Sequence, residues 1–145
     1  MRTSRWLCVA VSVAGFLMAP LFSVQALAAP AVQQQGAVSF MSGGVGVTEM
    51  QEMKALTSGY PLELLFVAKS VPRRYLSSVK VQIKDKGGKV VLETESQGPL
   101  LLAKLPKGTY SIRADNDGKV ERRTVHVGSG KTQRAVFVWN QRVDQ

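Results

Sequence analysis

Residues 60–139 alternate between hydrophobic and polar positions, a period of two that is typical of strands with one buried face. Seven strands are predicted there: "PLELLF", "VKVQIKD", "VVLETE", "LLLAKL", "TYSIRAD", "VERRTVHV" and "QRAVFVW". The segments between them are rich in turn residues, and "DKGGK" and "NDGK" are typical of tight hairpins. Short strands at this spacing predict an antiparallel sandwich of two sheets.

One set of alternate residues in each strand is expected to face the core. The expected inward residues are Leu62, Leu64, Phe66, Val79, Val81, Ile83, Val90, Leu92, Tyr110, Ile112, Ala114, Ala135, Phe137 and Trp139. The residues between them are expected to face solvent, as Lys80, Gln82 and Lys84 do in the cleanest alternation of the chain.

A helical period precedes the strands. Thr48 stands three residues before Gln51, the spacing of a capping box, and Met50, Met53 and Leu56 recur at helical spacing. One short amphipathic helix is therefore predicted over residues 48–58, after a glycine loop with Gly43, Gly44 and Gly46. Its methionine stripe is expected to dock on its own domain, with a partner-binding face as the alternative.

The first 28 residues have the three parts of a secretory signal peptide. Arg2 and Arg5 precede an apolar run over residues 6–22, and "SVQALAAP" follows with the small residues that signal peptidase requires. Cleavage is expected between Ala28 and Ala29. An uncleaved anchor is the alternative, but the run is shorter than the roughly 20 apolar residues of a spanning helix. No later segment is apolar enough to span a membrane, so a periplasmic, secreted or cell-surface protein is expected.

The remaining chain divides by composition. Residues 29–40, "APAVQQQGAVSF", show little helical or strand period, so we expect a flexible or loosely docked arm. Residues 41–59 are predicted to form the glycine loop and helix, residues 60–140 the sandwich, and residues 141–145 a tail.

The residue types argue against most catalytic chemistry. Cys8 is the single cysteine and lies in the signal segment, and His126 is the single histidine, whereas zinc sites usually combine several such ligands. No nucleophile has a recognisable base beside it in the sequence. We therefore expect no catalytic residue, no cofactor and no metal.

The segment "GSGKT", residues 128–132, looks like part of a phosphate-binding loop. That motif needs another glycine where Val125 stands, and a helix after it, whereas a strand is predicted after Thr132. Without a helix there is no row of amides to hold a phosphate. The segment is therefore predicted to be a hairpin turn.

Basic residues outnumber acidic ones, 19 to 10, for a net charge of +9. Loss of Arg2 and Arg5 with the signal segment would leave 17 against 10, a net charge of +7. The candidate binding surface comprises Arg73, Arg74, Tyr75, Arg122 and Arg123. Such a field would attract lipopolysaccharide phosphates, acidic glycans or an acidic protein, but the plainer interpretation is a solvated face that keeps edge strands apart. Nucleic acid is not an expected partner of an exported protein.

Two segments, "GPLLLAKLPKGTYSIRAD" and "VHVGSGKTQRAVFVW", resemble the carboxypeptidase regulatory-like domain. The shared features are a leucine-proline-x-glycine-x-tyrosine turn and a closing aromatic strand. With "SGGVG", "YPLELLF" and "YLSSVKVQIKD", the chain is similar over about residues 38–139 to small exported bacterial proteins that carry this domain. Lys107 departs from the pattern, since such turns often carry a second proline there.

The resemblance implies an all-β fold: a seven-stranded antiparallel prealbumin-like (transthyretin-like, Ig-like) sandwich preceded by one short α-helix. It implies no carboxypeptidase activity, because one histidine cannot supply the ligands of that zinc centre. Collagen-adhesin repeats of this type join a lysine and an asparagine covalently, and Lys69 and Asn140 are placed comparably, although that placement is common.

The expected function is an exported non-catalytic binding or assembly module of the bacterial cell envelope. In that role the arm over residues 29–40 would dock a partner by adding a strand. The alternative is a binder of anionic glycan or lipopolysaccharide phosphate that uses Arg73, Arg74 and Tyr75. A pH-sensitive patch of Arg122 and His126 on one strand face is a further alternative, but a lone strand histidine is more often structural.

Overall fold

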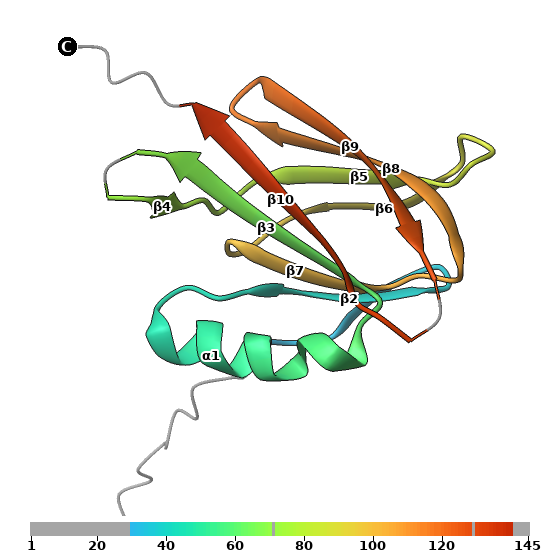
Figure 1. Ribbon diagram of the computed structural model, residues 1–145, viewed down its shortest axis with the longest axis horizontal. Coiled ribbons are helices and arrows are strands. Elements are labelled where there is room, and N and C mark those ends of the chain that lie inside the picture. The colour runs from blue at the N-terminus through green and yellow to red at the C-terminus, as the bar shows by residue number, and fades with distance from the viewer. Residues whose placement is uncertain (1–29, 71, 129, 141–145) are drawn as a thin grey trace, which may run out of the picture.

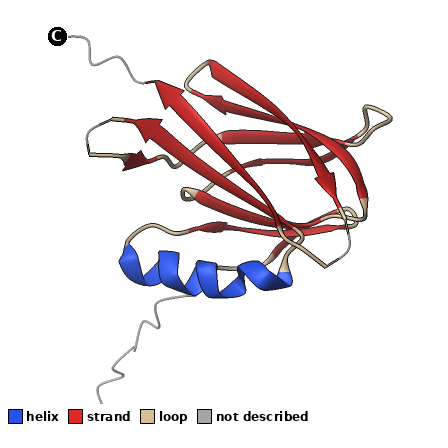
Figure 2. Ribbon diagram, in the orientation of Figure 1, coloured by secondary structure: helices blue, strands red, loops and turns tan. Residues whose placement is uncertain are grey.

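The computed structural model describes residues 30–70, 72–128 and 130–140. In these residues two sheets face each other, and one helix lies on the outer face of the larger sheet (Figure 1, Figure 2). The expected signal segment and the tail over residues 141–145 lie outside the described residues. Within them, no helix is long and apolar enough to cross a membrane.

The larger sheet has the strand order β1-β2-β7-β3-β10, with β4 also paired to β3. Its strands are β1 (Gln33–Gln35), β2 (Val38–Gly43), β3 (Leu62–Lys69), β4 (Arg74–Tyr75), β7 (Leu100–Lys104) and β10 (Gln133–Asn140). The smaller sheet, in the order β6-β5-β8-β9, consists of β6 (Val90–Glu95), β5 (Lys80–Lys84), β8 (Gly108–Asn116) and β9 (Lys119–Val127). The helix α1 (Val47–Leu56) continues into a 3-10 turn (Thr57–Gly59).

The predicted two-sheet architecture is confirmed, but a wholly antiparallel sandwich of seven strands is wrong. Strand β10 runs parallel to β3 along its whole length, from Gln133 beside Leu62 to Asn140 beside Lys69. The cause is the segment over residues 128–132, which joins β9 of the smaller sheet to β10 of the larger sheet. It is therefore a crossover between sheets, and the prediction of a hairpin turn there is wrong.

The N-terminal arm is a second correction, because residues 33–43 form strands β1 and β2. The two strands turn at Gly36, whose positive φ of 57° suits glycine, and β2 pairs antiparallel with β7. Five of the six residues of β2 are buried, including all four from Phe40 to Gly43, so both faces of the strand are covered. A strand buried on both faces loses the alternation on which sequence prediction depends.

The main core lies between the two sheets and is filled by the expected alternate residues. Phe66, Phe137 and Trp139 form a connected aromatic group in it, with ring centroids 5.8 to 6.3 Å apart. One expected core residue, Val90, is instead 39% exposed. A bulge beside Ile83 shifts the pairing of β5 and β6, so that Val91 packs against the core in its place.

A second apolar layer joins α1 to the outer face of the larger sheet. Met50 and Met53 pack on this face, which confirms that the methionine stripe docks on its own domain. Their partners are Met41, Tyr60, Leu65, Val67, Leu100 and Leu102. Leu56 is exposed, and the helix begins after Gly46 without a side-chain cap, so the predicted capping box is wrong.

Candidate functional site

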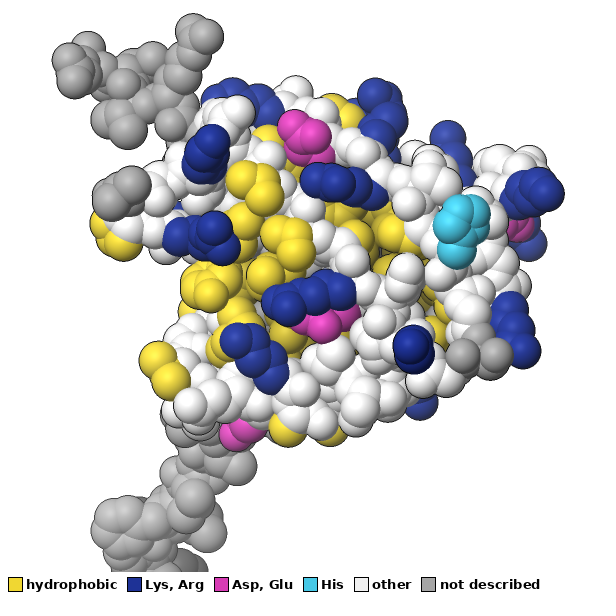
Figure 3. All heavy atoms as spheres, in the orientation of Figure 1, with side chains coloured by type: hydrophobic (Ala, Val, Ile, Leu, Met, Phe, Trp, Pro, Cys, Tyr) yellow, Lys and Arg dark blue, Asp and Glu magenta, His cyan; other side chains and the backbone are white. Residues whose placement is uncertain are grey.

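A groove lies between α1 and β4, on the outer face of the larger sheet, and holds a volume of about 540 Å³. Gly44 and Pro99 line it together with residues from both walls. Figure 3 shows hydrophobic side chains gathered on the face of the molecule above α1, with Lys and Arg side chains among and around them. The groove has the size range of ligand-binding clefts and a mainly apolar lining.

One flank of α1 forms the first wall. Residues three and four apart share a helix face, so Val47, Gln51 and Lys54 line the groove while Met53 faces the sheet. Val47 is 75% exposed, and Val45, in the glycine loop before the helix, is 61% exposed. The apolar part of this wall is therefore uncovered, and Lys54 is the charged residue in the lining.

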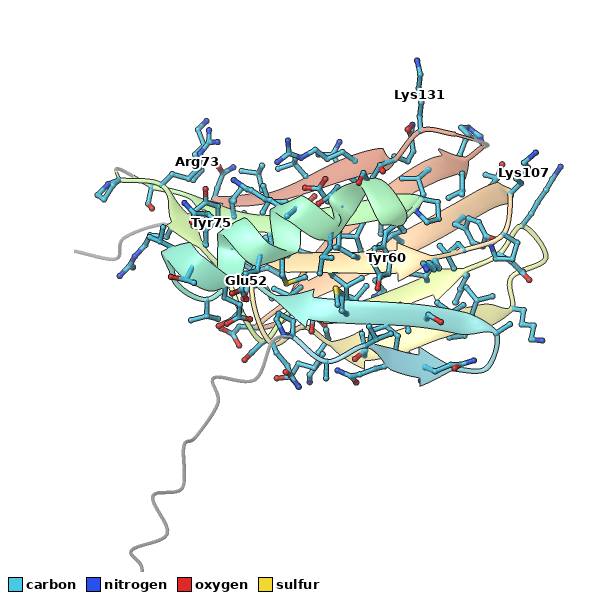
Figure 4. All side chains as sticks on the ribbon, turned by 90° about the horizontal axis from the view of Figure 1, so that it is seen from below. Glu52, Tyr60, Arg73, Tyr75, Lys107 and Lys131 are labelled. Atoms are coloured by element: carbon cyan, nitrogen blue, oxygen red, sulfur yellow. The ribbon has the colours of Figure 1, made fainter. Side chains whose placement is uncertain are left out.

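Strand β4 and the residues after it form the second wall. Tyr75, Leu76 and Ser77 line the groove, and the Tyr75 side chain is 57% exposed. Tyr75 pairs with Val67 of β3, so both side chains project from the outer face of the sheet. Figure 4 shows Tyr75 beside α1, with Arg73 at the same end of the molecule.

The acidic residues of α1 do not line this groove. The Glu49 carboxylate accepts a hydrogen bond from the Gly44 amide, 3.0 Å away, on the side of the helix toward β2. The Glu63 carboxylate on β3 lies 3.4 Å from the Arg134 guanidinium. Lys54 therefore supplies the charge of the groove, as a cation.

The structure divides the predicted binding surface. Tyr75 lines the groove, but Arg74 pairs with Ala68 and points to the opposite face of the sheet. Arg122 and Arg123 lie on β9 of the smaller sheet, and β3 and β10 separate that strand from β4 (Figure 1). Because successive strand residues point to opposite faces, these two arginines also diverge. The five residues therefore do not form one patch.

The sequence analysis did not single out Val45, Val47 and Lys54, which line the groove. The available signal was a pair of valines in a glycine-rich loop before a helix, where no core alternation requires them. Their place in the groove depends on the position of β4, which is 20 residues or more away in the chain, so no local pattern could reveal it.

A second hollow of about 450 Å³ lies at the other end of the sandwich, between the β1–β2 turn and β6. The Tyr110 hydroxyl, at its edge, donates a hydrogen bond to the Pro106 carbonyl at 2.7 Å. Burial, and then the negative charge of Asp85, raise the pKa of Tyr110 above its usual value. The hydroxyl is therefore held neutral and already bonded, which suits a structural role rather than general base chemistry.

The crossover over residues 128–132 also has a structural explanation. The Thr132 hydroxyl lies 2.8 Å from the Tyr60 carbonyl and 3.1 Å from the Thr57 carbonyl, to which it can donate. These hydrogen bonds connect the crossover to the turn that follows α1. A strand follows the segment, as predicted, so no helix N-terminus is present there to bind phosphate.

Two further sequence alternatives fall at ordinary surface positions. Lys69 and Asn140 lie opposite each other at the ends of β3 and β10, and both are exposed. The His126 ring nitrogen Nδ1 is 2.8 Å from the Thr109 hydroxyl on the neighbouring strand. His126 is thus already partnered within the smaller sheet.

Comparisons with known proteins do not assign an activity. The chain matches no protein-family model and no curated protein. Within the described residues, no group of three or more His, Cys, Asp or Glu side chains is placed to hold a metal ion.

Proposed function

We propose that the protein is an exported non-catalytic binding or assembly module of the bacterial cell envelope, with the groove between α1 and β4 as its binding site. We further propose that its sandwich is a carboxypeptidase regulatory-like domain. Export is supported by the arginines, apolar run and small residues before Ala29. The turn and strand motifs described above support the domain assignment.

One observation carries the binding role. Val45, Val47 and Tyr75, all large and more than half exposed, surround a single groove. Single exposed apolar residues are common on proteins, but apolar residues grouped around a cleft mark a binding surface. Covering each of them would contribute on the order of 1 kcal/mol, so a partner that fills the groove gains from its apolar lining.

The experiment is affinity capture with the chain that a bacterial host exports to its periplasm, which is expected to begin at Ala29. The bait is exposed to detergent-treated envelope extract at low and at high salt. The groove variant Val47→Glu is matched by Leu56→Glu, which also introduces a glutamate at an exposed apolar residue, on the other flank of α1. We expect the wild type and Leu56→Glu to retain one set of molecules at both salt concentrations, and Val47→Glu to lose it. Equal retention by both variants would refute the groove as the site.

A second candidate function is binding of anionic glycan or lipopolysaccharide phosphate through the basic surface. The net charge of +7 expected after loss of the signal segment and the exposed Arg73, Arg74, Arg122 and Arg123 favour it. Salt screens exposed charges, so this function predicts anionic polymer retained at low salt and released at high salt. The double substitution Arg73→Ala with Arg74→Ala should then weaken the retention of anionic polymer. Val47→Glu should act mainly on apolar contacts, so it should weaken this retention less.

A further inference from the structure

The edge of β4 that faces away from β3 offers backbone groups to a ligand in the groove. The Leu76 amide donates to the Phe66 carbonyl at 3.0 Å, and Tyr75 pairs with Val67 in an antiparallel register. Neighbouring residues of an antiparallel strand direct their backbone groups to opposite sides. The amide and carbonyl of Tyr75 therefore point away from β3, and no backbone partner meets them within the part of the chain that the structure describes.

The groove thus combines a strand edge with the apolar flank of a helix. The Tyr75 side chain and Val47 form its two apolar walls, and both residues are mostly exposed. A peptide that adds to a strand edge gains affinity from backbone hydrogen bonds and specificity from pockets for its alternate side chains. This geometry suits an extended chain: its backbone bonds Tyr75 while a side chain enters the groove.

Other occupants fit these groups less well. An acyl chain has no amide or carbonyl along its length, so it would cover Tyr75 and leave the strand edge unbonded. A second copy of the exported protein would bring another net charge of +7 to a groove whose lining carries Lys54. Like charges disfavour such pairing, whereas an acidic segment is attracted.

We propose that the groove binds an extended acidic segment of a partner protein, which adds a strand to the open edge of β4 and places an apolar side chain between Val47 and Tyr75. This inference rests on the proposed function and names the partner chemistry of the same site. It also reverses the direction expected from the sequence: the N-terminal arm occupies β1 and β2 of its own sheet, and the partner supplies the added strand.

The test begins with random dodecapeptides displayed on phage and selected on protein expressed from its full coding sequence. Enriched peptides are synthesised, and their affinities are measured for the wild type, Val47→Glu and Leu56→Glu. We expect enriched sequences with apolar residues at alternate positions and acidic residues between them. Their affinity should fall about tenfold or more with Val47→Glu and less than about twofold with Leu56→Glu. Thermal unfolding checks that both variants are folded, which their exposed positions favour.

A backbone control separates strand addition from a purely apolar contact. N-methylation of alternate peptide amides removes the donors that would meet the Tyr75 carbonyl, and methylation of the intervening amides is the matched control. We expect one methylated series to lose binding about tenfold and the other to keep it. Equal effects of the two series would overturn strand addition.

The remaining outcomes also overturn the proposal. These are the absence of enriched peptides, or enrichment of peptides whose affinity is the same for Val47→Glu and the wild type. Phosphatidylglycerol vesicles are tested in parallel. Vesicle binding that Val47→Glu abolishes, with no peptide enriched, would replace the peptide by a lipid and leave the groove as the binding site. Failure of the proposed function differs, because the envelope capture would then also show no dependence on Val47.

Discussion

Gly98 lies at a close contact between two parts of the chain that are distant in sequence. Gly98 lies in the connection from β6 to β7, directly against the backbone of Gly43 at the end of β2. Beside it, the Gln97 amide donates to the Ser42 hydroxyl at 3.1 Å. The sequence marks Gly98 as a turn residue before a proline, whereas the fold shows that two backbone segments meet there.

Gly98→Ala should therefore lower the free energy of unfolding by about 1 to 3 kcal/mol, because an added methyl group would collide with the Gly43 backbone. Gly59→Ala is the matched control, since a methyl group there meets no atom within 4 Å. Urea unfolding measures both, and the control should change by less than about 0.5 kcal/mol. Equal stability of the two variants would contradict the close contact.

At the scale of elements, the N-terminal strands close one side of the sandwich. The Gln35 side chain on β1 reaches β6 of the other sheet, where its Oε1 accepts from the Glu93 amide at 2.6 Å. Its Nε2 donates to the Glu93 carbonyl at 3.2 Å. The side-chain amide therefore takes the place of one residue of a partner strand, and it covers part of an edge that would otherwise be open to pairing.

Replacing Gln35 by Ala should expose this edge. We expect faster hydrogen exchange of the Glu93 amide and a loss of about 0.5 to 1.5 kcal/mol in unfolding free energy, the usual range for such bonds. Gln34→Ala is the matched control, because the Gln34 amide bonds the Gly36 carbonyl within its own turn. Exchange at Glu93 that is equally slow in both variants would show that Gln35 does not protect the edge.

At the scale of the whole molecule, residues before 60 are part of the fold rather than an attachment to it. Strand β2 pairs with β7 along five positions, and α1 covers Leu65, Val67 and Leu100 on the outer face of the larger sheet. The groove exists only because this helix lies opposite β4. The domain must therefore include these residues in order to fold and to form the groove.

A fragment of residues 60–145 should consequently show no cooperative unfolding transition. A fragment of residues 30–145 should unfold cooperatively. Without β2 and α1, the outer face of the larger sheet exposes apolar side chains that no other described element covers. Trp139, the single tryptophan in both fragments, reports the transition by fluorescence from its position against Phe137. Matching urea midpoints for the two fragments would contradict this account of the domain.

The sequence by itself determined the strands that have one solvated face, together with their hairpins. In β5, lysine alternates with buried valine, and in β8, serine alternates with buried isoleucine. The local pattern therefore agrees with the burial at Val81 and Ile112. It also determined the position of α1 to within a few residues. Met50 and Met53 of α1 pack on the apolar outer face of the sheet beside them.

The tertiary structure decided what depends on partners distant in the chain. Strand β2 is buried on both faces and shows no alternation, and the parallel pairing of β3 with β10 follows from a crossover that reads locally as a turn. The groove also depends on segments distant in the chain, because Val47 and Tyr75 line one cleft only when α1 docks on the sheet. A hydrophobic period reports which face of one element is buried, but not which element buries it.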